Sequence, residues 1–280
     1  MLGVVGDLVE DVVVQLTGPV NLASDTEATI TRRRGGSAAG VAVAAAGICG
    51  SARFIGQVGD DTAGRALVGE LVDAGVDAVV RHRGRTGSIV VVVDHRGERT
   101  MLSDRASCTR LDAPERGWLD DLEVLHVPFY SLAVQPLART ARTLVEWAHQ
   151  RRITVSVDTS SSAILTRFGT DRAIRLLADI GPAVLLGNTD EAAVLGPAFD
   201  PAATGASTTV VHGRRAAEVR VRGESATRVA AHTIAGVRDT TGAGDSFAAG
   251  FLVALASGAS PADAARAGHD AARASIETAR

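Results

Sequence analysis

The chain has 280 residues, a formal net charge of -3, 22% charged residues and only 3% aromatic residues. This composition argues against a basic nucleic-acid-binding or anionic-membrane surface and against a base-stacking platform. All 29 basic residues are arginine, which excludes Walker-A phosphate loops, the protein-kinase fold and Schiff-base chemistry, because each requires a lysine.

The cysteines and the apolar runs bear on where the protein works. Cys49 and Cys108 form neither a C-x-x-C pair nor a metal-ligand spacing, which favours a reduced compartment. The first residues carry acids and no basic stretch, so we expect no signal peptide. The longest uncharged run, 35–52, is rich in Gly and Ala, whereas a membrane span needs about 20 strongly apolar residues. We therefore expect a cytoplasmic protein with no membrane partner.

The first hundred residues contain mostly β-type segments. Two apolar runs flank His95-Arg96-Gly97-Glu98, which indicates a β-hairpin with a glycine in its loop. The segment 62–75 is spaced as an amphipathic helix, with Ala66, Leu67, Leu71 and Val72 on one face. In chain order we expect strands at 2–6 and 12–16, a β-leaning segment at 28–34, a turn and helix over 35–47, a strand at 53–58, a helix at 62–75 and a hairpin over 88–103.

From residue 124 onward, strands alternate with helices, which predicts a mostly parallel sheet covered by helices on both faces. The early β segments do not fit this alternation. We therefore expect one domain over 1–280 with a small β lid built from about 11–34 and 88–103. The later elements expected are strand–helix pairs at 124–127 and 136–150, 153–158 and 172–178, and 183–186 and 188–195, a strand at 209–211, a hairpin through 217–221, and helices at 241–256 and 261–277.

The strongest chemical signal is the run DTTGAGDSF, residues 239–247, directly before an apolar helical segment. Gly242 and Gly244 let backbone N–H groups approach a ligand, and a helix N-terminus adds unpaired N–H groups and a positive dipole, so phosphate is a suitable ligand. Asp245 would repel phosphate at rest, but it could take the proton of a hydroxyl that attacks phosphate. It could equally be a first-turn acid that stabilises the helix.

Residues 239–247 resemble the C-terminal signature of the ribokinase-like (PfkB) carbohydrate kinases, D-T-x-G-A-G-D. The resemblance extends along essentially the whole chain. The segments 35–39 and 56–64 resemble the N-terminal signature, Asp11 resembles the sugar-hydroxyl ligand, and N-T-D-E at 188–191 resembles the N-x-x-E motif that organises Mg²⁺ and phosphate. The resemblance implies a three-layer α/β sandwich with a mostly parallel central sheet and a small β lid.

The activity implied by this resemblance is ATP-dependent phosphorylation of a hydroxyl on a sugar or sugar-like small molecule. Asn188 and Glu191 would organise Mg²⁺ indirectly, and Asp239 with the Thr241 carbonyl matches positions that bind a monovalent cation such as K⁺ in some members. The protein could also form a homodimer through the lid. The implied residues are Asp245, Gly242, Ala243 and Gly244 for catalysis, with Asp245 as general base; Asp11, Gly35, Gly36 and Ser37 for substrate; and Asn188, Glu191, Gly213, Thr241 and His269 for the nucleotide.

Several of these residues have a purely structural alternative. The spacing of 188–191 is also that of a capping box, with Asn at the N-cap and an acid at N3. Asp11 could be an ordinary strand-end acid, although a carboxylate is a natural acceptor for two vicinal hydroxyls. Asp239 could bond its own backbone in a turn. His269 could be solvated on a helix surface, and for Asp158 we expect a structural or peripheral role.

The chain also departs from the family pattern. Gly40 stands where the family normally has an Asn that helps to hold the sugar, and Val211 and Ala216 replace the Thr and second Gly of the nucleotide-contacting T-x-G-x-x-G segment. Two alternatives therefore stay open beside the sugar kinase. One is a nucleoside kinase on the same fold, with Phe129 and Tyr130 available for stacking. The other is a non-catalytic regulator that binds a sugar or a nucleotide.

Overall fold

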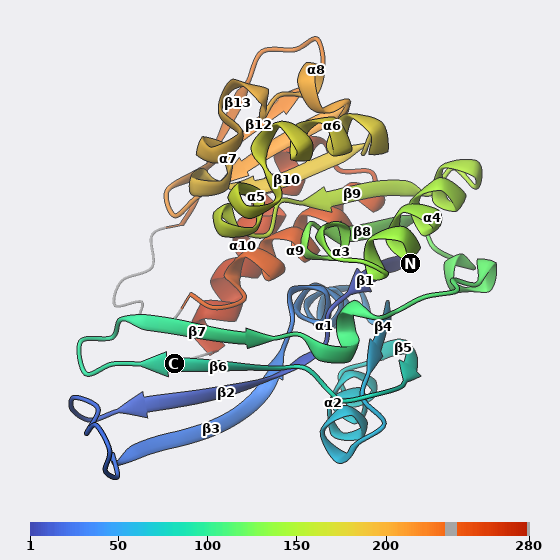
Figure 1. Ribbon diagram of the computed structural model, residues 1–280. Coiled ribbons are helices and arrows are strands. Elements are labelled where there is room, and N and C mark those ends of the chain that lie inside the picture. Colours follow the sequence, from blue (N-terminus) through green and yellow to red (C-terminus); the bar gives the residue numbers. More distant parts are fainter. Residues whose placement is uncertain (233–239, 279–280) are drawn as a thin grey trace.

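The computed structural model describes residues 1–232 and 240–278 of the chain (Figure 1). A large sheet occupies the centre, with the strand order β13-β12-β11-β10-β9-β8-β1-β4-β5. All neighbours from β11 to β5 pair in parallel, and β12 and β13 are antiparallel additions at one edge. The strands are β1 (Leu2–Gly6), β4 (Ala52–Val58), β5 (Val76–His82), β8 (Val124–Pro128), β9 (Thr154–Asp158), β10 (Val184–Asn188), β11 (Thr208–His212), β12 (Ala216–Val221) and β13 (Thr227–Ala230).

The helices cover this sheet on both faces, so the predicted sandwich is present. Val4 and Val5 are neighbours on the central strand β1, yet they belong to the two opposite apolar cores, because successive strand residues point to opposite faces. One core includes α1 (Ser37–Cys49), α2 (Thr62–Asp73), α9 (Ala243–Ala256) and α10 (Pro261–Thr278). The other includes α3 (Tyr130–Ala133), α4 (Leu137–Gln150), α5 (Ser162–Phe168), α6 (Thr170–Ile180) and α7 (Thr189–Leu195). The shorter elements are α8 (Pro201–Thr204), η1 (Ala106–Thr109), η2 (Arg116–Leu119) and η3 (Gly196–Ala198).

Small residues determine how closely α1 can pack against its neighbours. The buried positions of this helix are five alanines and one valine. Since alanine side chains are short, α1 packs directly against both β1 and α9. This contact brings the start of α1 beside the start of α9, where the glycine-rich loop ends.

A second sheet projects to one side of the molecule in Figure 1 and has the strand order β3-β2-β6-β7. Its strands are β2 (Val9–Leu16), β3 (Ala28–Gly35), β6 (Ser88–Val93) and β7 (Arg99–Asp104). The β2–β3 and β6–β7 pairs are antiparallel, whereas β2 and β6 pair in parallel. The segments expected to leave the main sheet therefore do form a separate lid-like sheet. None of the described helices has the length and apolar character that crossing a membrane requires.

Candidate active site

Asp245 lies in the first turn of α9 and faces the start of α1. Its Oδ1 accepts a hydrogen bond of 2.7 Å from the Ser37 hydroxyl. Burial raises the pKa of Asp245 to about 7, the Ser37 bond opposes that rise, Asp7 and Glu191 add to it, and Arg34 opposes it. A carboxyl with this pKa changes its protonation state near neutral pH, which suits a group that must accept a proton.

The glycine loop before Asp245 has fewer free amides than the sequence suggests. Gly242 is the N-cap of α9 with φ 77°, a left-handed conformation that favours glycine. The Ala243 amide donates to the Thr240 carbonyl at 3.1 Å, so it is not free for an anion. The amides of Gly244 and Asp245 follow in the first turn, where no earlier helical carbonyl can accept from them. The prediction that Ala243 contributes its amide is therefore wrong for this conformation.

The lid reaches this loop. Arg99, the first residue of β7, donates a hydrogen bond of 2.8 Å from Nη1 to the Thr241 hydroxyl. Thr241 was predicted to contact the nucleotide and, through its carbonyl, a monovalent cation. The other predicted cation ligand, Asp239, lies outside the described residues.

The predicted substrate residues of the lid base do lie together. Asp11 on β2 covers Gly35 on β3, because a Cβ on Gly35 would lie 2.1 Å from Asp11 Oδ1. The next residue, Gly36, has φ 103° and leads directly into α1. Asp11 is only 8% exposed; burial raises its pKa, and Arg33, 3.8 Å away, opposes that rise. The shielded carboxylate of Asp11 thus lies against the end of β3, the strand that leads into α1 and Ser37.

Sequence reasoning missed a charged pair beside this group. Asp7, at the end of β1, is 3% exposed, accepts from the Ala38 amide at 3.2 Å and forms an ion pair with Arg105. The Arg105 guanidinium also lies over the Tyr130 ring, 4.0 Å from its centroid. The available signals were an acid directly after an apolar strand and an arginine two residues after a predicted hairpin. Neither signal identifies its partner, which is 98 residues away along the chain.

Arg34 was also missed. It lies next to Gly35 on β3 and is partly buried, and its burial lowers the pKa of its guanidinium. Glu70, Asp245 and Asp11 oppose that effect, so Arg34 lies within the electrostatic field of the two candidate site acids. It therefore brings positive charge close to both of them.

The predicted Mg²⁺-organising residues form the capping box that their spacing allows. Asn188 Oδ1 accepts from the Glu191 amide at 3.0 Å, and Glu191 Oε2 accepts from the Asn188 amide at 2.9 Å. Glu191 also accepts from Asn188 Nδ2 at 2.7 Å and from the Thr159 hydroxyl at 2.7 Å. Both carboxylate oxygens are therefore occupied by protein donors, which fits an indirect role and not direct ligation.

Asp158 lies at the end of β9, next to this box. Burial, and then the neighbouring Glu191, raise its pKa well above the ordinary value. Neither acid forms an ion pair within residues 1–232 and 240–278, and the same residues contain no group of three His, Cys, Asp or Glu side chains placed to hold a metal. Mg²⁺ usually keeps several of its waters, so two adjacent acids without a cationic partner fit a hydrated Mg²⁺ better than a directly bound one.

An aromatic group lies on the other side of α9. His269 is 7% exposed and meets Phe247 edge-on at 5.1 Å, so the alternative that it is a solvated surface residue is wrong. His212 stacks on the same ring at 4.7 Å, and burial lowers its pKa to about 4. Gly213 follows His212 directly. A cavity of about 270 Å³ adjoins this group and is lined by Arg228, Val229, Ala230, His232, Arg266, His269 and Asp270.

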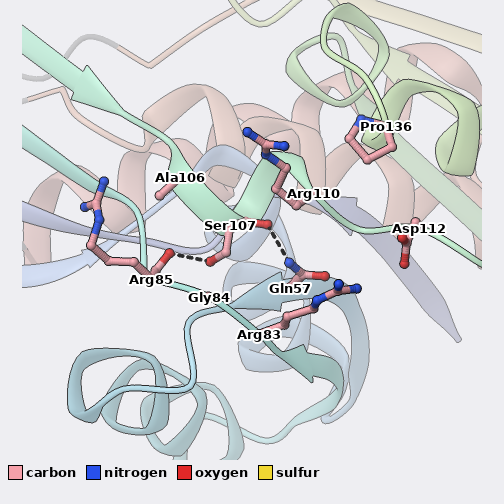
Figure 2. A pocket seen from close by; sticks show the side chains of 9 residues that line it. All are labelled: Gln57, Arg83, Gly84, Arg85, Ala106, Ser107, Arg110, Asp112 and Pro136. Carbon is pink, nitrogen blue, oxygen red and sulfur yellow. Dashed lines mark hydrogen bonds between the residues drawn. The ribbon is translucent and has the colours of Figure 1, made fainter.

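A further cavity, of about 420 Å³, lies where the β6–β7 hairpin joins the main body (Figure 2). Gln57 of β4 donates from Nε2 to the Ser107 carbonyl at 3.1 Å across it. Arg85 is paired with Asp104, outside the lining. The cavity is lined by Gln57, Arg83, Gly84, Arg85, Ala106, Ser107, Arg110, Asp112 and Pro136, and none of the predicted site residues is among them.

Comparison with known proteins decides the family. Residues 2–279 match the pfkB family of carbohydrate kinases. The chain belongs to this family. It is 31% identical over 261 residues to a fructokinase of Klebsiella pneumoniae, covering 85% of this chain and 81% of that enzyme. It is also 31% identical over 246 residues to an ATP-dependent ribose-1-phosphate kinase of Halopiger xanaduensis, covering 82% of this chain and 76% of that enzyme.

Solved structures show the same fold. An adenosine kinase from Sinorhizobium meliloti superposes with a TM-score of 0.86 at 24% identity, covering 99% of this chain and 93% of that one. A sugar kinase from Pyrococcus horikoshii in complex with ATP gives 0.82 at 19% identity, covering 99% and 92%. The predicted family and the ribokinase-like fold are therefore confirmed. This pfkB-family protein is a phosphotransferase with an alcohol group as acceptor.

Proposed function

We propose that this kinase transfers the terminal phosphoryl group of ATP to a hydroxyl of a sugar or sugar-like small molecule, with Asp245 as the general base. The observation that carries the proposal is the half-buried Asp245 carboxyl, whose pKa is raised to about 7, in the same helical turn as the Gly244 amide. A proton acceptor and an anion site within one turn let a hydroxyl and a phosphate meet in a reactive geometry. Family membership supports ATP as the donor.

In the proposed mechanism, the Asp245 carboxylate accepts the proton of the substrate hydroxyl as its oxygen attacks the terminal phosphorus. The bond between that phosphorus and the oxygen bridging to the β-phosphate breaks, and ADP leaves with the bonding electrons. The Gly244 and Asp245 amides and the positive end of α9 stabilise charge on the transferred group. The lid excludes water, which would otherwise compete as acceptor.

Asn188, Glu191 and Asp158 would hold Mg²⁺ through water molecules, and the cation would supply positive charge to the ATP phosphates. The carbonyl of Thr241, together with Asp239, is our proposed site for a monovalent cation such as K⁺. His269 and Gly213 are proposed to lie at the nucleotide end of the site, because the aromatic group around Phe247 adjoins a cavity there.

The substrate side offers recognition of hydroxyl groups but no stacking face from Phe129. Asp11, next to Gly35 and Gly36, offers a shielded carboxylate to a pair of hydroxyls. Phe129 is fully buried and packs edge-on against Phe168 at 5.2 Å, so it offers no face to a base. This argues against the stacking role considered for it in a nucleoside kinase.

This proposal can be tested with a panel of sugars, sugar phosphates, sugar acids and nucleosides. For each compound, ATP consumption and formation of the phosphorylated product are measured. We expect turnover with one or a few sugar-like members and its loss in Asp245→Asn. Binding of a panel member without any product would support the non-catalytic regulator. Turnover that survives Asp245→Asn would remove the proposed base.

The lid supplies a candidate surface for the proposed homodimer. Ile30 on β3 and Leu102 on β7 are 60% and 59% exposed. The strand pairings place both on the same face of the lid sheet, whereas Met101 is the neighbour of Leu102 on β7 and points to the opposite face. Exposed apolar residues gathered on one small sheet often mark an interaction surface. Mass measurement in solution should give a dimer for the natural chain and a monomer for the double variant Ile30→Glu, Leu102→Glu; a monomeric natural chain would contradict this.

A further inference from the structure

Helix α1 presents two positions to the Asp245 carboxylate. Ser37 and Gly40 are three residues apart, so they lie on the same side of the helix. The Ser37 hydroxyl donates to Oδ1 at 2.7 Å. A Cβ built on Gly40 would lie 2.5 Å from Oδ2 and 3.0 Å from the carboxyl carbon. One carboxylate oxygen is therefore bonded to α1, and the other occupies the space that any side chain at position 40 would need.

This arrangement is specific to the start of α1. Atoms of two side chains do not approach to 2.5 Å without displacement, and Asp245 is the end of a side chain, so it would be the group that moves. Gly47 on the same helix is different, because a Cβ there would meet nothing within 4 Å. The Asn that the family normally carries at position 40 could not coexist with the carboxylate position observed here.

We propose that Ser37 and Gly40 are positioning residues for Asp245: the Ser37 hydroxyl orients the carboxylate, and the missing side chain at Gly40 leaves the space in which it lies. This inference rests on the proposed function, in which Asp245 is the base. Ser37 thereby acts through Asp245, and not through the substrate contact that the family resemblance implied.

The charges around Asp245 make the Ser37 bond important. Besides burial, Asp7 from the β1–β2 connection and Glu191 from α7 disfavour its ionised form, whereas Arg34 from β3 favours it. The charge of Asp245 in turn raises the pKa of Asp158 on β9. Among residues 1–232 and 240–278, Ser37 is the one hydrogen-bond donor recorded for this carboxylate. A donor to a carboxylate stabilises the ionised form, so removal of the hydroxyl should make Asp245 harder to ionise.

The first test is the pH dependence of kcat/KM in Ser37→Ala, with the sugar found in the panel. The acid limb should move up by roughly one pH unit, because a hydrogen bond to a charged group is lost. Activity should fall most below pH 7 and recover in alkaline solution, with the KM for ATP unchanged. Ser37→Thr keeps a hydroxyl and should restore the natural profile. An unchanged profile in Ser37→Ala would overturn the role of Ser37.

The second test compares Gly40→Ala with Gly47→Ala, which add the same methyl group to the same helix. Displacement of a reacting group by about 1 Å can cost on the order of 100-fold in rate. We expect kcat to fall by at least about tenfold in Gly40→Ala, with ATP affinity and the thermal unfolding midpoint retained, and no change in Gly47→Ala. Equal kcat values for the two variants would overturn the role of Gly40.

A third measurement does not need turnover. The titration of the Asp245 carboxyl carbon by NMR should move to higher pH in Ser37→Ala and return in Ser37→Thr. If Asp245→Asn keeps full turnover, the proposed function fails, whatever this titration shows. If Asp245→Asn is inactive while Ser37→Ala and Gly40→Ala behave as the natural protein, only the positioning role fails.

Discussion

Two acids in this protein occupy the same position in two different helices. Asp245 is the third residue of α9 and Glu191 the third residue of α7. The N-cap of α7 is Asn188, whose amides hold Glu191 in a capping box that the Thr159 hydroxyl extends. The N-cap of α9 is a glycine, which has no side chain to offer, and Asp245 turns instead to Ser37 on another helix.

The comparison indicates how a first-turn acid becomes available for chemistry. A capped carboxylate has its oxygens bonded by local donors, so it stabilises its helix and stays where it is. Asp245 has one recorded donor and a raised pKa, and it lies beside free amides. The identity of the N-cap residue therefore accounts for the difference between the two acids: Asn188 holds Glu191 in a structural role, whereas Gly242 leaves Asp245 available for the proposed role as base.

Replacing Asp245 by Asn should give the largest effect. The substitution keeps the shape of the side chain and removes its charge and its ability to accept a proton. General-base catalysis contributes about 10²–10⁴-fold, so kcat should fall by at least this order. ATP affinity should hold or rise slightly, because a like charge is removed from beside the phosphates. Initial rates and nucleotide affinity on the same purified variant test this, and near-normal kcat would contradict it.

The same substitution should change how stability depends on pH. Burial raises the pKa of Asp245 from 3.8 to about 7, so the folded protein favours the protonated carboxyl more than the unfolded chain does. The resulting contribution to the free energy of unfolding is complete below pH 4 and is lost as the pH rises to 7. Asp245→Asn removes this loss. A shift of this size is worth roughly 4 kcal/mol at full burial, and Asp245 is only partly buried, so we expect about 1–3 kcal/mol.

Thermal unfolding at pH 5 and pH 8 measures this difference. The gain in Tm from Asp245→Asn should be several degrees larger at pH 8 than at pH 5. Asp179→Asn, which changes an exposed acid on α6, should give the same change in Tm at both pH values. A gain from Asp245→Asn that is equal at pH 5 and pH 8 would mean that Asp245 ionises normally in the folded chain.

The main architecture was predictable because it rests on local patterns. Alternation of strands and helices after residue 124 predicted the parallel sheet, and Gly97 between two apolar runs predicted the lid hairpin. The sequence did not predict the edge strands β5 and β13. Most residues of β5 are half-buried and most of β13 are exposed, so neither strand alternates clearly between buried and exposed positions. On α2, Leu67 and Leu71 are buried as expected, but Val72 is 57% exposed, because the packing on β5 uses a narrower face than the periodicity suggested.

The candidate site divides in the same way. Asp245 and the two glycines before it were found from a local motif, and the capping box was found from spacing. The Ser37–Asp245 bond joins residues 208 positions apart, and the Asp7–Arg105 pair joins residues 98 apart. No local pattern specifies such contacts, because they depend on which helices and strands the topology brings together. Burial of His269 was missed for the same reason, since Phe247 covers it from α9.

A smaller effect is expected at the other acid of the comparison. Glu191→Gln keeps the size of the side chain, removes its charge and puts a donor where a donor already points. The capping loss should cost about 0.5–2 kcal/mol of stability. If Glu191 also organises hydrated Mg²⁺, the Mg²⁺ concentration that gives half-maximal rate should rise several-fold, because the negative charge near the cation is lost. Rates over a Mg²⁺ titration and the Tm of the same variant measure both effects.

Thr159→Val separates the two roles of Glu191. This change removes the hydroxyl that donates to Glu191 Oε2 but keeps the carboxylate charge. It should lower stability by a similar amount, about 0.5–2 kcal/mol, because a buried acceptor loses one donor. It should leave the Mg²⁺ profile almost unchanged. Equal Mg²⁺ profiles in Glu191→Gln and Thr159→Val, both with lower Tm, would mean that Glu191 acts only in the capping box. The contrast with Asp245 would then be between a purely structural acid and the proposed base.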